Sequence, residues 1–157
     1  MTVTIREARR VELPSLFERT IETSWNDLPP ALRTRTSRRE LEGQIRRLID
    51  RLLAGGESTF LVAEDADGRN VGHVWLGETT EAFSGERRGY IYDLYVVPEA
   101  RRRGVARALM AAAEDLARRR GYREIGLTVA THNDAARHLY ESLGYLPERL
   151  LLTRPLE

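Results

Sequence analysis

Hydrophobic residues recur along this chain with two different spacings, and each spacing predicts one type of secondary structure. In four stretches they return every three or four residues, as on the buried face of an amphipathic helix. Between these stretches lie short apolar runs rich in β-branched and aromatic residues, which predict strands. The helices are predicted within residues 13–25, 41–53, 105–120 and 136–143, and the strands at residues 3–5, 59–63, 71–76, 90–97, 125–129 and 149–152.

Residues at the ends of these stretches support the predicted helices. Pro14 suits the first turn of the first helix, where a backbone N–H has no partner to lose. Ser37 and Glu40 have the spacing of a capping box, and Gly55 follows the apolar stripe that they open. The consecutive prolines at 29–30 cannot continue the first helix. The chain therefore predicts two separate helices before its second strand.

The order of the predicted elements, β-α-α-β-β-β-α-β-α-β, indicates a single domain of the α/β class. The runs at 59–63 and 71–76 flank a turn and predict an antiparallel hairpin. Residues 77–89 are polar and contain glycines, so we expect a loop there. The strands at 90–97 and 125–129 are separated by a helix, and such a right-handed crossover joins parallel strands. A mixed sheet follows from these two kinds of pairing.

Composition narrows the class of protein. With 41% hydrophobic and 31% charged residues, the 157-residue chain can bury a core and does not resemble a disordered tail. No apolar run approaches the ~20 residues that span a bilayer, and the first residues lack the long apolar segment of a secretory signal. These features predict a cytoplasmic protein that does not bind membranes. A net charge of +1 gives no general attraction to nucleic acid, although all 25 basic residues are arginine.

Several chemistries have no candidate residues in the sequence. Cysteine is absent, which excludes disulfides, thiolate nucleophiles and cysteine-based zinc sites. The histidines, His73, His132 and His138, do not have the spacing of a metal motif, so we expect structural or surface positions and no metal. Neither the Gly-x-Ser-x-Gly pattern of hydrolases nor the Gly-Lys-Ser/Thr of phosphate-binding loops occurs.

The segment from residue 94 to residue 109 combines a buried strand, an arginine-rich turn and the start of an amphipathic helix. It reads Leu-Tyr-Val-Val-Pro-Glu-Ala-Arg-Arg-Arg-Gly-Val-Ala-Arg-Ala-Leu. The first turn of a helix has unpaired N–H groups and a partial positive charge, and these bind phosphate. Gly104 lacks a Cβ and Ala106 is small, so a phosphate can approach the backbone closely. The alternative is a surface loop with solvated arginines before an ordinary helix.

The pattern Arg101-x-x-Gly104-x-Ala106 closely resembles the pyrophosphate-binding signature of the GCN5-related N-acetyltransferase (GNAT) family. The resemblance continues through Asn133, Tyr140 and the Gly-Tyr pair at 144–145. It spans nearly the whole chain and is weakest before residue 58. The order of the predicted elements is also that of this family.

The resemblance implies a GNAT-like mixed sheet whose central strands splay apart around acyl-CoA. Acetyl-CoA would be the donor substrate, with its pantetheine arm paired to the sheet like an added strand. Asn133 matches the family residue whose amide contacts the cofactor, and it can equally be a helix N-cap. The residues implied in cofactor binding are Leu94, Tyr95, Val96, Arg101, Arg102, Arg103, Gly104, Val105, Ala106, Arg107, Asn133 and Tyr140.

Tyr140 and Asp93 are the candidate catalytic residues. Tyr140 resembles the general acid of the family: a phenol with a pKa near ~10 can protonate a thiolate leaving group with a pKa near ~8.5. An acceptor amine must lose a proton before it attacks, because an ammonium has no lone pair. Asp93 lies inside an apolar strand, where aspartate is disfavoured, and burial makes a carboxylate a stronger base.

The residues leave an alternative open for each of these roles. Tyr140 can simply fill the core beside its helix. Asp93 can be a structural hydrogen-bond or salt-bridge partner on the sheet. Glu78, Glu81 and Tyr92 lie near the strand ends and compete with Asp93 for the role of the base.

The resemblance implies an acetyl-CoA-dependent N-acetyltransferase domain over residues 1–157, which moves an acetyl group directly to a primary amine of a small molecule or peptide. The alternative is a non-catalytic module that binds or senses acyl-CoA on the same fold. The acceptor, the acyl-chain preference and the oligomeric state stay open, although family members are often homodimers. Residues 77–89 and the connection at 25–35 would build the acceptor pocket, where the resemblance is weak.

Overall fold

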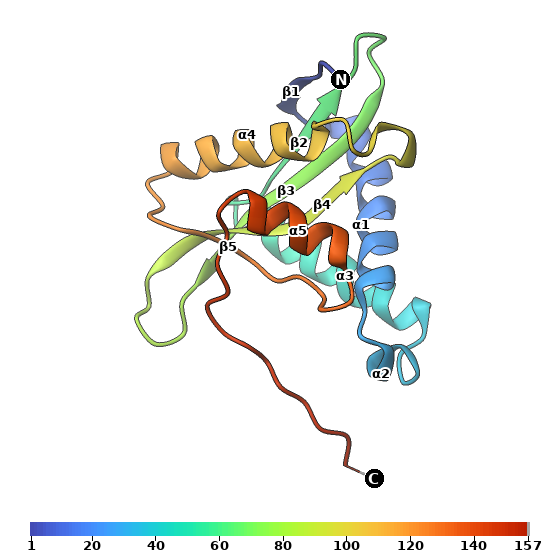
Figure 1. The fold of residues 1–157 in the computed structure, drawn as a ribbon, viewed down its shortest axis with the longest axis vertical. Coiled ribbons are helices and arrows are strands. Elements are labelled where there is room, and N and C mark those ends of the chain that lie inside the picture. Colours follow the sequence, from blue (N-terminus) through green and yellow to red (C-terminus); the bar gives the residue numbers. More distant parts are fainter. Residues whose placement is uncertain (157) are drawn as a thin grey trace.

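A computed structural model describes residues 1–156 as one five-stranded sheet with helices on both faces (Figure 1). Two short 3₁₀ turns, η1 and η2, complete the secondary structure. Within the described residues, no helix is both long and apolar enough to cross a membrane. The elements, in chain order, are β1 (Thr4–Glu7), η1 (Arg10–Glu12), α1 (Leu13–Asp27), α2 (Pro30–Arg33), α3 (Arg38–Ala54), β2 (Thr59–Glu64), β3 (Asn70–Thr80), β4 (Arg87–Val96), η2 (Pro98–Ala100), α4 (Val105–Arg119), β5 (Ile125–Leu127) and α5 (Asp134–Ser142).

The strands lie in the sheet in the order in which they occur in the chain, β1-β2-β3-β4-β5. The first three pairs are antiparallel. Short turns join β2 to β3 and β3 to β4, helices α1 to α3 lie between β1 and β2, and β4 and β5 are parallel because α4 crosses over between them. The predicted α/β class, hairpin and parallel crossover are therefore confirmed.

Local sequence signals set the ends of the longer helices. The capping box of α3 is formed: the Ser37 side chain accepts from the Glu40 amide, and the Glu40 carboxylate accepts from the Ser37 amide at 2.7 Å. Pro14 lies in the first turn of α1, as its missing N–H predicts. Gly121 follows α4 with a φ of 80°, a left-handed conformation that favours glycine at the end of a helix.

Each face of the sheet packs against a different set of helices. We call these the α4 face and the α1/α3 face. Alternating residues of a strand point to opposite faces, so Leu61 and Val74 pack under α4, while Phe60 and Trp75 pack under α1 and α3. Helix α5 lies on the α4 face, where Tyr140 and Leu143 contact the edge of that core.

The loop predicted over residues 77–89 is wrong. Strand β3 continues to Thr80 and β4 begins at Arg87, so the two strands form a longer hairpin with a short turn between them. The polar residues of this extension do not need a core, because cross-strand contacts stabilise it. Arg87 donates to Glu78 from Nε at 2.7 Å, for example.

The final strand predicted at residues 149–152 is also wrong. Residues 146–156 have no regular structure and run away from the body of the molecule in Figure 1. A strand needs a neighbouring strand edge for its backbone groups, and this segment forms no backbone hydrogen bond within the described chain. Its leucines, Leu150 among them at 80% exposure, consequently remain in solvent.

Candidate active site

Strands β4 and β5 separate part-way along the sheet, and we call this place the β4–β5 opening. Strand β4 pairs with β5 only through its residues 89–91. Beyond them Leu94, Tyr95 and Val96 pair with β3 alone, so their other backbone edge has no strand beside it. The carbonyl of Val96 accepts a hydrogen bond from Arg101 Nε at 3.0 Å. The resemblance predicts a splay between central strands, whereas this opening lies between β4 and the edge strand β5 of the described sheet.

An arginine-rich turn joins this end of β4 to α4. Two of its residues have left-handed backbone conformations, Arg102 with a φ of 61° and Gly104 with a φ of 84°. Gly104 is the N-cap of α4, and no side chain caps the helix there. A Cβ added at Gly104 would meet no atom within 4 Å, so space lies open over the turn. Uncapped N–H groups beside open space are suited to an anion.

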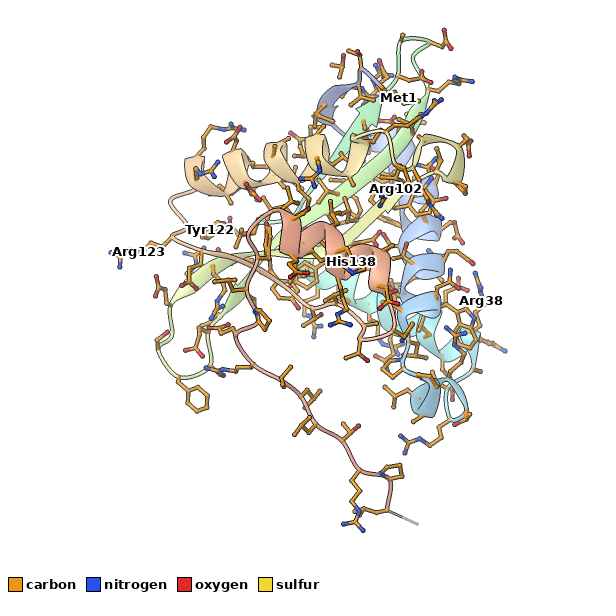
Figure 2. All side chains as sticks on the ribbon, viewed as in Figure 1. Met1, Arg38, Arg102, Tyr122, Arg123 and His138 are labelled. Carbon is orange, nitrogen blue, oxygen red and sulfur yellow. The ribbon has the colours of Figure 1, made fainter. Side chains whose placement is uncertain are left out.

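The side chains of this turn are positively charged, and the start of α4 has a partial charge of the same sign. Arg101, Arg102 and Arg103 are exposed and have no carboxylate of residues 1–156 within ion-pair distance. Figure 2 shows Arg102 near Met1, whose amino group donates to the Arg103 carbonyl at 3.1 Å. Arg107 lies one turn into α4 and donates to Ser142 on α5 at 2.6 Å. These guanidinium groups can add to the attraction for a phosphate.

Asp93 is buried on the α1/α3 face beside a β-bulge. Trp75 lies opposite Asp93 and Leu76 opposite Ile91, so Tyr92 is the extra residue of β4. The Asp93 Oδ2 atom accepts two hydrogen bonds, from the Thr20 hydroxyl of α1 at 2.8 Å and from His73 Nε2 of β3 at 2.6 Å. Oδ1 has no hydrogen-bond donor among residues 1–156.

His73 completes this network from the middle of the sheet. Its side chain is fully buried and stacks on Tyr95, with ring centroids 5.8 Å apart. Nδ1 has no partner in the described chain. The hydrogen bonds from Thr20 and His73 thus hold the Asp93 carboxylate in place.

Tyr140 projects from α5 beside the same opening. Its ring lies 5.8 Å from that of Tyr145, and its hydroxyl has no hydrogen-bond partner among residues 1–156. Burial raises the pKa of Tyr140 above the ordinary value of 10.0, and the carboxylates of Asp93 and Asp27 raise it further. The phenol thus stays protonated at neutral pH with its proton free to be donated.

Asn133 has the N-cap position that the sequence allows. Its Oδ1 accepts from the Ala136 amide at 3.1 Å, and its Nδ2 donates to Asp27 at the end of α1. One N–H of the amide remains for another acceptor. The cap is therefore confirmed, and a contact with a ligand stays a prediction.

The competing candidates for the base lie elsewhere, on the hairpin of β3 and β4. Arg87 and Tyr122 hold the Glu78 carboxylate and lower its pKa. Backbone and side-chain hydrogen bonds from Ser84 lead the contacts that lower the pKa of Glu81 to about 2. Tyr92 donates its hydroxyl to the Glu78 carbonyl at 3.0 Å. These contacts favour the charged forms of Glu78 and Glu81, whereas burial raises the pKa of the Tyr92 hydroxyl.

Two residues of the site, Thr20 and Asp27, were missed by the sequence reasoning. Thr20 lies four residues after Leu16 on the predicted apolar face, and a polar residue on that face could have been noticed. The sequence gives no such signal for Asp27, because this residue falls in the predicted break between the first two helices. His132 and His138 are exposed, with His138 on α5 (Figure 2), and no three potential metal ligands gather anywhere in residues 1–156.

Comparison with known proteins identifies relatives of one kind. Residues 17–145 match the acetyltransferase (GNAT) family. The uncharacterized N-acetyltransferase YhfO of Bacillus subtilis is 39% identical over 93 residues, which are 59% of this chain and 62% of that protein. Mycothiol acetyltransferase of Beutenbergia cavernae is 41% identical over 88 residues, 56% of this chain and 28% of that protein. The matches thus span less than two thirds of these curated relatives.

Solved structures share the whole fold. A protein from Pyrococcus furiosus, assigned as an acetyl transferase, has a TM-score of 0.80 and 30% identity, and covers 99% of this chain and 100% of that one. An acetyltransferase of Clostridium acetobutylicum that contains acetyl-CoA has a TM-score of 0.74 and covers 98% of this chain and 96% of that one. At 16% identity, this similarity supports the fold alone.

Proposed function

Because the chain belongs to the acetyltransferase (GNAT) family, we propose that it transfers an acetyl group from acetyl-CoA to a primary amine of a small molecule or peptide. The observation that carries this proposal is the open edge of β4, which leads directly to the uncapped, arginine-rich start of α4. A strand-like donor and an anionic group attached to it can be held at these two adjoining places.

The residues at the turn fit the donor substrate. Backbone N–H groups at the start of α4, from Val105 to Arg107, would bind the diphosphate, with Arg101, Arg102 and Arg103 adding charge. Leu94 and Val96 would pair with the pantetheine arm through the backbone edge that faces no strand, with Arg101 releasing the Val96 carbonyl, and Tyr95 lies between them. When bound, acetyl-CoA supplies the acetyl group as a thioester.

Asp93 would receive the proton that the acceptor amine loses. Its Oδ2 is committed to Thr20 and His73, so the proton would arrive at Oδ1, directly or through a water molecule. The same two hydrogen bonds orient the carboxylate, which is the structural role that the sequence left open. Both roles are compatible, because they use different oxygens.

Tyr140 would supply a proton to the leaving sulfur. Its raised pKa keeps the phenol protonated, and its hydroxyl has no competing partner within the described chain. A thiolate is stabilised by a hydrogen bond from the phenol even before the proton is fully transferred. An ammonium first loses one proton to solvent. When the neutral amine attacks, its nitrogen proton goes to Asp93 and the phenol proton to sulfur, which gives the amide and the thiol, and proton transfer from Asp93 to Tyr140 through solvent restores both groups.

Binding of the donor is tested by thermal unfolding with coenzyme A and acetyl-CoA. A ligand that binds only the folded protein raises the melting temperature. Gly104→Glu should abolish this shift, because it puts bulk and negative charge over the turn. Gly121→Glu is the matched control at the other end of α4: it has a similar φ, 80° against 84°, and the same open surroundings. An equal coenzyme A shift in both variants would contradict the assigned turn.

Catalysis is tested with acetyl-CoA, a panel of primary amines and detection of the released thiol. Tyr140→Phe should keep the coenzyme A shift and slow turnover by about 10²-fold, the usual loss of a general acid. Tyr145→Phe is the control, since its hydroxyl bonds Glu114 at 3.0 Å and has no assigned chemistry. A coenzyme A shift with no turnover on any amine would favour the non-catalytic module instead.

A further inference from the structure

Asp27 differs from the other partly buried carboxylates of the chain. Throughout residues 1–156, each of the others has an arginine or a histidine within ion-pair distance, and the remaining unpaired carboxylates are exposed. Asp27 has a single hydrogen bond, from Asn133 Nδ2 to Oδ1 at 2.9 Å, and its Oδ2 has none. In a chain this rich in arginine, a half-buried carboxylate without a cation is unusual.

The helix around Asp27 adds to its negative potential. Asp27 is the last residue of α1, where carbonyl groups without intrahelical partners carry a partial negative charge. No basic residue lies in the last turn of α1. Arg33 caps this end, but its guanidinium donates to the carbonyls of Trp25 and Asn26, at 2.7 Å and 2.9 Å, and makes no ion pair with Asp27.

Asp27 also borders the candidate active site. Its bond to Asn133 and the bond between His132 and the Asn26 carbonyl at 3.1 Å hold the end of α1 against the start of α5. Two turns along α5 lies Tyr140, whose hydroxyl responds to the charges of both Asp27 and Asp93. A molecule that reached Tyr140 from the α1 side would therefore meet Asp27.

A carboxylate is suited to a cation that does not react. The attacking nitrogen must be neutral when it attacks, because an ammonium has no lone pair, and an ion pair with Asp27 would keep it protonated. A second amino group of the same acceptor has no such requirement and can stay charged throughout. Asp27 therefore matches the non-reacting ammonium of a diamine or polyamine.

We propose that Asp27 determines acceptor specificity by binding a second, non-reacting ammonium group, so that the preferred acceptors carry at least two amino groups. This inference rests on the proposed N-acetyltransferase function. It has one further consequence, because a cation bound at Asp27 offsets the negative charge near Tyr140. The pKa of the phenol then falls toward its ordinary value, and the phenol becomes a better acid. Binding of the correct acceptor would thus assist departure of the thiolate.

The test compares acceptors that differ only in the second amino group: putrescine against butylamine and cadaverine against pentylamine. Wild-type protein should have a kcat/KM about tenfold to a hundredfold higher for each diamine, as expected for a hydrogen-bonded ion pair. Asp27→Asn should abolish this preference without slowing transfer to the monoamines, since the asparagine oxygen still accepts from Asn133 and loss of the charge makes Tyr140, if anything, a better acid. Asp134→Asn removes the same charge one residue beyond Asn133 and should keep the preference.

A binding readout separates this inference from a purely structural role. Putrescine should raise the melting temperature of the wild-type protein saturated with coenzyme A, and Asp27→Asn should abolish that increase without changing the shift by coenzyme A alone. If Asp27→Asn lowered kcat/KM equally for diamine and monoamine, the inference would be overturned. It would also be overturned if the wild-type protein did not prefer diamines. In both cases acetyl transfer itself persists, so the proposed function stands. No transfer to any amine would overturn the function, and the inference with it.

Discussion

The two faces of the sheet are built from the same strands and differ in what they bury. The cluster of buried side chains on the α4 face is entirely apolar, with Leu109 and Met110 among its fully buried members. The α1/α3 face buries aromatic residues too, but it also holds Thr20, His73 and Asp93 in contact with one another. The α4 face is closed mainly by apolar packing, with the buried Thr59 accepting from Arg120 at its edge, whereas the polar groups of the α1/α3 face bond one another.

The two faces of the sheet therefore have different functions. On the α4 face, apolar packing anchors a helix whose exposed first turn is free to bind an anion. On the α1/α3 face, a β-bulge brings Tyr92 and Asp93 into one neighbourhood, and the polar network orients a carboxylate beside the β4–β5 opening. The buried polar side chains bond one another because unpaired groups there are costly, although His73 Nδ1 has no partner among residues 1–156.

The largest expected effect comes from breaking the polar network. Asp93→Ala should lower the free energy of unfolding by about 3 to 5 kcal/mol, since it leaves Thr20 and His73 without an acceptor in the core. Urea unfolding measures the loss. Asp93→Asn keeps an oxygen for Thr20 and should cost clearly less. If the free energy of unfolding of the alanine variant fell by less than about 1 kcal/mol, the network would not contribute to stability.

A single cavity on the α4 face should lower the free energy of unfolding somewhat less. Leu109→Ala removes a fully buried side chain between α4 and the sheet and should cost about 3 kcal/mol. The same urea experiment measures it. Because no polar partner is orphaned, turnover of the folded fraction should stay near that of the wild type. A variant that kept full stability but lost activity would mean that the α4 face is not merely structural.

An ion-pair cluster at the edge of the sheet should contribute less than either face, and in a pH-dependent manner. Arg6 of β1 bonds Glu12 at 2.8 Å and Glu64 of β2 at 2.7 Å. The Arg6 hydrogen bond leads the contacts that lower the pKa of Glu12 from 4.5 to about 2. The resulting stability is therefore present above pH 4.5 and is lost as the pH falls toward 2. Its size is about 2 kcal/mol, allowing for solvent screening.

Glu12→Gln should remove this pH dependence. Its free energy of unfolding, measured by urea titration from neutral to acidic pH, should approach that of the wild type as the pH falls. Glu7→Gln changes an exposed carboxylate next to Arg6 in β1 that has no ion pair within residues 1–156, and it serves as the control. A constant difference between Glu12→Gln and wild type across this range would contradict the assigned linkage.

The smallest expected effect lies at the start of α3, outside both faces. Ser37→Ala removes the side-chain acceptor of the capping box and should cost about 1 kcal/mol. Thermal unfolding measures it as a small decrease in melting temperature. Ser37→Asp restores a capping oxygen and should recover most of the loss. If Ser37→Ala and Ser37→Asp were equally destabilised, the cap would not be the cause.

Much of the fold and part of the site could be predicted, because the relevant signals are local. Helices α1, α3, α4 and α5 follow from apolar periodicity and caps, and the arginine-rich turn follows from its order of strand, glycine and helix. The extension of the β3–β4 hairpin could not be predicted, because its polar residues are stabilised by the facing strand rather than by a core. The final strand was wrong for the converse reason: its leucines favour a strand, yet no strand edge lies beside them in the described chain.

The amino-acid sequence alone determined the element order, the parallel crossover, the turn at residues 101–104 and the positions of Tyr140 and Asp93, because these depend on neighbours a few residues apart. Only the tertiary structure decided that Thr20 and His73 hold Asp93, and that Asp27 lies unpaired beside the start of α5. These contacts join residues 20 to 106 positions apart, and no periodicity or cap depends on such distant partners. Packing of α1 and α5 about the separated ends of β4 and β5 brings them together.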